Sequence, residues 1–155
     1  MPKAGLMFAK KDDWATPKSI VAHFGKFDYD PATTKAKADE FGVANFDTIE
    51  TDGLKSDWTR FRRIWINPPF TRKQEFLKKA VETFWQTKAD IYILLPIDFL
   101  TTKSFHDILR PWGGGCLCAK WANQVRKWSR QDKLTSVWEL YRETCRHINN
   151  YHGAI

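Results

Sequence analysis

Residues 64–70 read Ile-Trp-Ile-Asn-Pro-Pro-Phe, and this short stretch decides the fold class. Its first three residues are apolar and favour β-structure, so they predict a strand over 64–66. The two prolines end that strand, because a proline has no N–H to donate to a sheet. In open α/β sheets, ligands bind beyond the carboxyl ends of the strands. The polar and aromatic residues at 67–70 are therefore expected to lie where such a sheet binds its ligand.

The residues that follow predict the rest of the sheet. Residues 72–85 carry apolar side chains at helical spacing, which predicts an amphipathic helix. Residues 91–95 form a continuous apolar run ended by Pro96, a pattern typical of a strand buried on both faces of a parallel sheet. A short helix and two more strands are expected at 104–109, 116–121 and 135–141. Together these elements predict an α/β fold, with a compact, mostly parallel sheet flanked by helices.

The residues before the central stretch predict two helices and a strand. Thr16 and Pro17 suit the start of a helix, with Thr as the cap and Pro at the first helical position. Residues 27–30 alternate apolar and acidic side chains, as a short strand does, and Pro31 would end it. Residues 32–42 are rich in Ala and Lys and predict a second helix.

Composition and charge limit how many domains the chain can form and which kinds of partner it can bind. The chain has 155 residues, of which 43% are hydrophobic, and this is enough to form the core of one domain. We expect a flexible basic arm over 1–13 and a single domain over 14–155. The formal net charge of +7 favours a polyanionic partner such as nucleic acid, although a basic balance is weak evidence by itself.

The cysteines argue for a reducing compartment. Cys116, Cys118 and Cys145 form neither a disulfide framework nor a common zinc pattern, even when His147 is added, so no metal site is expected. No signal peptide opens the chain, and no apolar run approaches the roughly 20 residues that span a membrane. We therefore expect a cytoplasmic protein without membrane association.

The stretch at 67–70 combines two hydrogen-bond acceptors with a flat apolar ring. The Asn67 side chain and the Pro68 carbonyl are acceptors held by the stiffness of Pro68 and Pro69, and Phe70 presents its ring beside them. Two acceptors on the hydrogens of an aromatic amine localise its nitrogen lone pair, so that the nitrogen can attack an electrophilic methyl group. The alternative is a rigid turn without chemistry, but such a tetrapeptide is rare directly after a strand.

Five motifs follow one another along residues 12–100. They are Trp14-x-Thr16-Pro17, Phe27-x-x-Asp30-Pro31-Ala32, Asp52-Gly53-Leu54-x-x-x-Trp58, Ile66-Asn67-Pro68-Pro69-Phe70 and Leu94-Leu95-Pro96. In this order the motifs resemble those of the phage-encoded DNA N6-adenine methyltransferases, the short Dam-type enzymes. The resemblance implies a Rossmann-like methyltransferase fold, S-adenosyl-L-methionine as cofactor and adenine in DNA as substrate. It also implies a flipped base held by residues 67–70, and by analogy a role in evading host restriction from the host cytoplasm.

The resemblance also implies roles for the residues of the other motifs. Thr16 and Pro17, with Trp14, would lie by the methionine end of the cofactor. Asp30, followed by Pro31, would face the methionine amino group or the ribose hydroxyls, and Asp52 would lie near the cofactor adenine. For each acid the alternative is a turn or cap carboxylate. Two features depart from the family pattern: no glycine follows Asp30, and Phe70 replaces the more usual Tyr.

Basic residues cluster in the sequence on both sides of the 67–70 stretch and again beyond residue 120. We expect them to form a collar around the site that contacts DNA phosphates. The residues are Arg60, Arg62, Arg63, Arg72, Lys73, Arg126, Lys127 and Arg130. No separate recognition domain is expected, so target recognition would come from short loops or from a second copy of the chain in a homo-oligomer.

Two classes of alternative stay open. The first keeps the fold and changes the substrate to the N4 amine of cytosine, to adenine in RNA or to a glutamine side chain. Cytosine enzymes more often carry Ser in place of Asn67, which favours adenine. The second is a DNA-binding relative that has lost the cofactor, which the missing glycines after Asp30 suggest. Binding of S-adenosyl-L-methionine would distinguish this relative from an enzyme.

Overall fold

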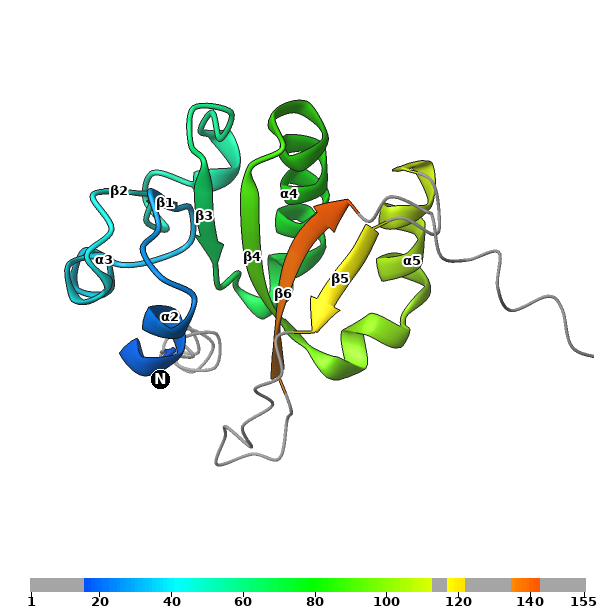
Figure 1. The fold of residues 1–155 in the computed structure, drawn as a ribbon, viewed down its shortest axis with the longest axis horizontal. Coiled ribbons are helices and arrows are strands. Elements are labelled where there is room, and N and C mark those ends of the chain that lie inside the picture. The colour runs from blue at the N-terminus through cyan, green and yellow to red at the C-terminus, as the bar shows by residue number, and fades with distance from the viewer. Residues whose placement is uncertain (1–15, 113–116, 122–134, 143–155) are drawn as a thin grey trace, which may run out of the picture.

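A six-stranded sheet with helices on both faces forms the protein (Figure 1). The computed structural model describes residues 16–112, 117–121 and 135–142. The expected arm at 1–13 and the basic stretch from 122 to 134 lie outside the described residues.

The order of the strands in the sheet is β2-β1-β3-β4-β6-β5. The first four strands in this order are parallel to one another, whereas β6 is antiparallel to both β4 and β5. Five strands therefore run in one direction, and the prediction of an α/β fold with a mostly parallel sheet is confirmed. The strands are β1 Tyr29–Asp30, β2 Asn45–Phe46, β3 Arg63–Ile66, β4 Asp90–Pro96, β5 Leu117–Trp121 and β6 Thr135–Arg142.

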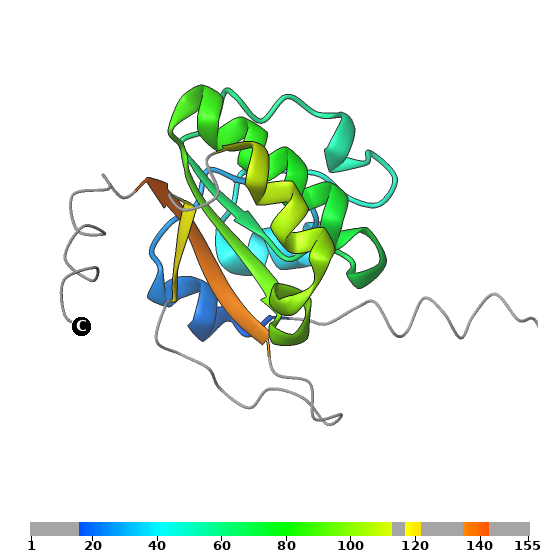
Figure 2. The same cartoon turned by 90° about the vertical axis from the view of Figure 1, so that its right-hand side faces the viewer.

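Helices cover both faces of the sheet, as Figure 2 shows from the side of α4 and α5. The described α-helices are α2 Lys18–His23, α3 Lys35–Phe41, α4 Lys73–Thr87 and α5 Lys103–Leu109. Short 3₁₀ helices follow the strand ends or connect elements: η1 Gly53–Lys55, η2 Phe70–Arg72, η3 Ile97–Thr101 and η4 Arg110–Trp112. The α2 and α3 helices lie on the face opposite to α4 and α5 (Figure 1).

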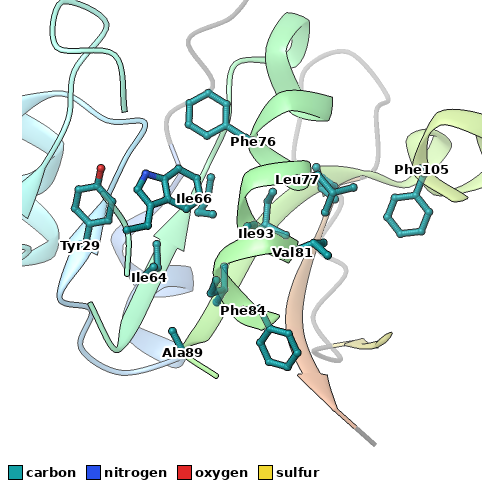
Figure 3. Close-up of a cluster of buried hydrophobic side chains, with 14 of the residues drawn as sticks. Tyr29, Ile64, Ile66, Phe76, Leu77, Val81, Phe84, Ala89, Ile93 and Phe105 are labelled. Carbon is teal, nitrogen blue, oxygen red and sulfur yellow. The ribbon is translucent and has the colours of Figure 1, made fainter. Parts of the chain in front are cut away.

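Alternation along β3 and β4 divides the core into two clusters. Ile64 and Ile66 of β3 pack with Ile93 of β4 beneath α4 (Figure 3), whereas Trp65 and Tyr92 pack on the opposite face. Successive side chains of a strand point to opposite faces, so a strand covered on both sides needs an unbroken apolar run. This requirement explains the apolar composition of both strands.

The α4 helix forms where its periodicity predicts it. The apolar residues Phe76, Leu77, Val81 and Phe84 are all buried against the sheet (Figure 3). Burying a side chain of this size contributes about 1.5–3 kcal/mol each, so packing rather than helix propensity stabilises α4. The helix ends at Thr87, and the capping residue Lys88 has a left-handed φ of 59°.

Two predictions about the amino-terminal elements are wrong. The first helix begins at Lys18, and Pro17 is its cap in an extended conformation without a side-chain cap hydrogen bond. Thr16 therefore does not cap it, because the Thr16 hydroxyl instead accepts a hydrogen bond from Asn67. The strand predicted over 27–30 spans only Tyr29–Asp30; Asp28, just before it, is joined to the start of β3 through its backbone N–H, which donates to the Arg63 carbonyl, and through its carboxylate.

Candidate active site

The predicted catalytic loop leaves the carboxyl end of β3, in the middle of the parallel strands. Asn67 directly follows the strand, and Pro68 is buried. Pro69 is extended, with φ −53° and ψ 136°, and its carbonyl accepts a hydrogen bond from the Arg72 N–H at 2.9 Å. Phe70 begins η2 and is partly buried. The loop thus passes from a buried strand into a closed helical turn, and both of its ends are held.

Lys73 braces the far end of this loop. Its ammonium group donates a hydrogen bond to the Phe70 carbonyl at 2.9 Å and lies 5.2 Å from the centre of the Phe99 ring. Phe99 belongs to η3, which follows β4, so the loops after the two central strands are connected through this lysine. Lys73, which the sequence assigned to DNA, therefore also has a structural contact at the site.

Asn67 is joined to the amino-terminal segment. Its side-chain Nδ2 donates a hydrogen bond to the Thr16 Oγ1 at 3.1 Å, although the two residues lie 51 positions apart. Thr16 is only 3% exposed. The structure thus brings together one residue predicted to be catalytic and one predicted to bind the cofactor.

Asp30 is a buried carboxylate at the carboxyl end of β1. Its side chain is 1% exposed, and its Oδ1 accepts a hydrogen bond from the Ala32 N–H at 3.0 Å. Burial raises the pKa of Asp30 to about 7, and hydrogen bonds from Ala32 and Thr33 only partly offset that effect. A carboxyl group in this state favours a cationic partner, because a positive charge would stabilise its ionised form.

A glycine does approach the Asp30 loop, but it comes from another segment. A Cβ atom on Gly53 would lie 2.0 Å from the Pro31 carbonyl oxygen, so only glycine fits there. The family pattern places glycines directly after Asp30, and this chain instead packs a glycine of the motif at 52–54 against the loop that follows Asp30. The contact brings Asp52 into the same region as Asp30.

Asp52 is paired with the residue that follows the catalytic loop. Its backbone is left-handed, with φ 55°, and its Oδ1 accepts a hydrogen bond from the Arg72 guanidinium at 3.0 Å. This hydrogen bond is the main reason why the pKa of Asp52 lies below its ordinary value. Arg72 also pairs with Glu75, at 3.2 Å between Nε and Oε1. Arg72, predicted to bind DNA, is thus held by two carboxylates.

Trp58 and Lys79 hold the turn at 53–56 in place. The buried Trp58 indole donates a hydrogen bond to the Gly53 carbonyl at 2.7 Å. The Lys79 ammonium group donates to the carbonyls of Leu54 and Ser56, both at 2.6 Å, and lies 5.2 Å from the centre of the Trp58 ring. The spacing from Asp52 to Trp58 in the third motif therefore has a structural cause: the indole fixes the turn that carries Asp52.

Asp47 is a candidate site residue that the sequence did not reveal. It follows β2, its N–H donates to the Asp30 carbonyl at 2.9 Å, and its carboxylate accepts a hydrogen bond from the Tyr29 hydroxyl. Burial acts to raise the pKa of Asp47, but hydrogen bonds from Tyr29 and Ser56 outweigh it and the pKa is lowered. The two-residue strand β2 has no pattern of its own, so only the sheet pairing places Asp47 beside Asp30.

Three of the predicted DNA-binding arginines lie away from the catalytic loop. Arg63 begins β3, about 13 Å along the strand from Asn67 at ~3.3 Å per residue, and Arg60 and Arg62 precede it in the chain. The structure therefore does not bring them into a collar around the site.

Arg63 has a structural environment of its own. Its guanidinium donates to the Phe24 carbonyl at 2.7 Å and stacks on the rings of Phe27 and Tyr92, at 5.3 and 5.5 Å from their centres. It therefore connects α2 to the sheet.

The remaining predicted site residues cannot be placed. Trp14, Arg126, Lys127 and Arg130 lie outside the described residues, as do Cys116, Cys145 and His147. Among the residues that the structure describes, no group of three or more His, Cys, Asp or Glu side chains could hold a metal ion. Within the same residues, no helix has the length and apolar character needed to cross a membrane.

Comparison with known proteins identifies the family. The family model described as DNA N-6-adenine-methyltransferase (Dam) matches residues 3–110. The chain belongs to this family. The match includes all five motifs of the sequence analysis, so the resemblance to Dam-type proteins is confirmed.

Two relatives in the Dam family are phage proteins. The chain is 35% identical over 94 residues to the DNA N-6-adenine-methyltransferase of Escherichia phage T1, covering 58% of this chain and 38% of that protein. It is 32% identical over 116 residues to the DNA N-6-adenine-methyltransferase of Haemophilus phage HP1 (strain HP1c1), covering 71% of this chain and 64% of that protein. The matches thus span less than two thirds of either relative. No solved structure matches the chain.

Proposed function

We propose that the protein transfers a methyl group from S-adenosyl-L-methionine to the N6 amine of adenine in DNA. One observation carries the proposal: in a chain of the Dam family, Asn67 and two prolines follow the central strand β3 at its carboxyl end, and the Asn67 amide is held in a defined orientation. This position is where parallel sheets bind ligands. The phage relatives, which carry the name of this activity, support the choice of substrate.

The residues around Asp30 fit the proposed cofactor. S-adenosyl-L-methionine would supply an electrophilic methyl group on a sulfonium, together with a cationic amino group. Asp30 is a buried carboxylate that gains from a cationic partner, because burial has raised its pKa to about 7. Asp47 and Asp52 follow on adjoining loops and would serve hydroxyl and amine donors of the nucleoside part. Pro17 and Pro31, with Trp14 of the undescribed segment, complete the proposed binding set, whereas the hydroxyl of Thr16, which the sequence analysis assigned to the cofactor, is hydrogen-bonded to Asn67.

The catalytic loop would act on the amine of the target base. The Asn67 Oδ1 and the Pro68 carbonyl would accept one hydrogen bond each from the N6 amine, which localises its lone pair for attack on the methyl carbon. The C–N bond forms as the S–C bond breaks, and the amine then loses a proton to solvent. No strong base is needed before transfer, so positioning and electrostatics account for catalysis.

The target adenine would have to leave the duplex, because its amine is paired within it. We propose that Phe70 stacks on the flipped base, an interaction worth about 1–3 kcal/mol per base. Lys73, close to Phe70, would contact the phosphate backbone of the DNA, as would Arg126, Lys127 and Arg130. Arg72 is already paired with two carboxylates. For Arg60, Arg62 and Arg63, DNA contact would require the duplex to reach the other end of β3. The expected setting is the cytoplasm of a phage host.

A methyl-transfer assay tests the proposal. The full chain is incubated with methyl-labelled S-adenosyl-L-methionine and either mixed-sequence duplex DNA or RNA, and the products are digested to nucleosides. We expect N6-methyladenine from DNA, and its loss in Asn67→Ala; the matched control is Asn45→Ala, which changes an exposed Asn on β2. Label on cytosine, or on RNA alone, would contradict the choice of substrate. Calorimetry that detects no binding of the cofactor would instead indicate the DNA-binding relative.

A further inference from the structure

The side-chain amide of the catalytic Asn67 has two ends of similar shape and opposite hydrogen-bonding character. Its oxygen accepts hydrogen bonds, whereas its NH₂ group only donates them. The proposed amine substrate also donates, so the amide must present its oxygen. Shape alone does not select that orientation, because a rotated amide fills nearly the same volume. A fixed acceptor for the NH₂ group does select it.

Thr16 supplies that acceptor. Its Oγ1 receives the hydrogen bond from the Asn67 Nδ2 at 3.1 Å. The Thr16 side chain is 3% exposed, so water does not readily replace it as the partner of the amide. Loss of this acceptor would therefore weaken the preference of the partly buried Asn67 amide for one orientation.

The surrounding elements hold Thr16 in this place. Pro17 is extended and caps α2 through its backbone alone, so the Thr16 hydroxyl is not used for helix capping. Val21 of α2 packs in one cluster with Trp65, which lies two positions before Asn67. The packing of α2 on β3 therefore fixes the position of the hydroxyl relative to the amide.

We propose that Thr16 is a positioning residue: its buried hydroxyl holds the Asn67 Nδ2 so that Oδ1 faces the amine of the substrate. This inference rests on the methyl transfer proposed above and gives Thr16 a role that differs from cofactor binding. Thr16 acts on the reaction through Asn67, so its loss should slow the chemical step more than it weakens either ligand.

Three variants separate the two roles of the side chain. Thr16→Val keeps the shape of the side chain and removes the acceptor, whereas Thr16→Ser keeps the acceptor and removes a methyl group. Thr16→Ala replaces Thr16→Val if the Thr16→Val protein does not fold. Each is measured by thermal unfolding, by calorimetric affinity for S-adenosyl-L-methionine, and by the single-turnover rate of methyl transfer with DNA and cofactor saturating. The pH and salt concentration are held constant.

We expect Thr16→Val to lower the saturated single-turnover rate by about 10- to 100-fold, the effect of one lost hydrogen bond at a catalytic group. Thr16→Ser should stay within about threefold of the unchanged chain, and cofactor affinity should change little in both. Such a split, with rescue by Ser, is not expected from a role in folding alone.

Other outcomes overturn the inference. A weaker cofactor affinity with an unchanged saturated rate would make Thr16 a cofactor contact. An unchanged rate in both Thr16→Val and Thr16→Ala would show that the amide does not depend on Thr16 for its orientation. In both cases the proposed function stands, because the unchanged chain is active. A chain that transfers no methyl group to adenine would overturn both proposals.

Discussion

Replacing Asp30 with Asn tests the buried carboxylate at the end of β1. In the folded chain burial raises the pKa of Asp30 to about 7, against an ordinary value of 3.8. The folded state therefore binds this proton more tightly than the unfolded state does. The stabilisation is complete below pH ~4 and is lost as the pH rises through 7, with a maximum of about 4 kcal/mol at ~1.36 kcal/mol per pKa unit.

The same two pKa values give the expected change in unfolding free energy over a pH range that can be measured. Between pH 5 and pH 8 the wild-type chain should lose about 3 kcal/mol of unfolding free energy through this group, and Asp30→Asn should not. Asp47 and Asp52 have lowered pKa values and are ionised in both states over this range, so they do not contribute. Urea unfolding at pH 5, 6, 7 and 8 measures the difference. The matched control is Asp39→Asn, an exposed residue of α3 that pairs with Lys35.

Cofactor binding gives a second measurement of Asp30. If this carboxylate meets the cationic amino group, the affinity for S-adenosyl-L-methionine should rise from pH 5 to pH 8 in the wild type, because ionisation supplies the negative charge. The affinity of Asp30→Asn should stay flat. Parallel unfolding profiles for wild type and Asp30→Asn would refute the reasoning about burial. A pH-independent cofactor affinity would refute only the assignment of Asp30 to the amino group.

Two further changes test the site. Gly53→Ala places a Cβ 2.0 Å from the Pro31 carbonyl, so we expect a loss of about 1–3 kcal/mol in urea unfolding and weaker cofactor binding; unchanged values in both would show that the two loops move apart freely. Phe70→Ala should leave the unfolding midpoint nearly unchanged and weaken methyl transfer by the energy of one stacking contact, about 1–3 kcal/mol, in the assay with saturating cofactor. Unchanged turnover in Phe70→Ala would contradict the stacking role.

Local patterns in the sequence were enough to predict the central part of the fold. The apolar residues of α4 recur at helical spacing because one face of the helix is buried, and the apolar runs of β3 and β4 are unbroken because both faces of each strand are buried. Each pattern can be recognised within the element's own sequence. The prolines at 68 and 69 end β3 wherever it lies in the sheet. The position of Asn67 at a strand end could therefore be predicted before any tertiary contact was known.

The pairing of distant segments could not be predicted in this way. The two-residue strand β2 has no period, and it exists because β1 offers a parallel edge beside it. Asp47 becomes a candidate site residue only through that pairing. Likewise, Arg63 looked like a phosphate contact by its position in the sequence, but its contacts with the rings of Phe27 and Tyr92 and with the Phe24 carbonyl place it between α2 and the sheet.

The sequence by itself determined which residues end the central strand and what chemistry they offer, because backbone stiffness and side-chain type are local properties. Only the tertiary structure decided what surrounds them: Thr16 beside Asn67, Gly53 against Pro31, and three arginines at the far end of β3. The physical reason is that a sheet brings strand ends together by register and direction. Two residues at the two ends of one short strand, such as Arg63 and Asn67, thus lie far apart, whereas Thr16 and Asn67, 51 positions apart in the sequence, share a hydrogen bond.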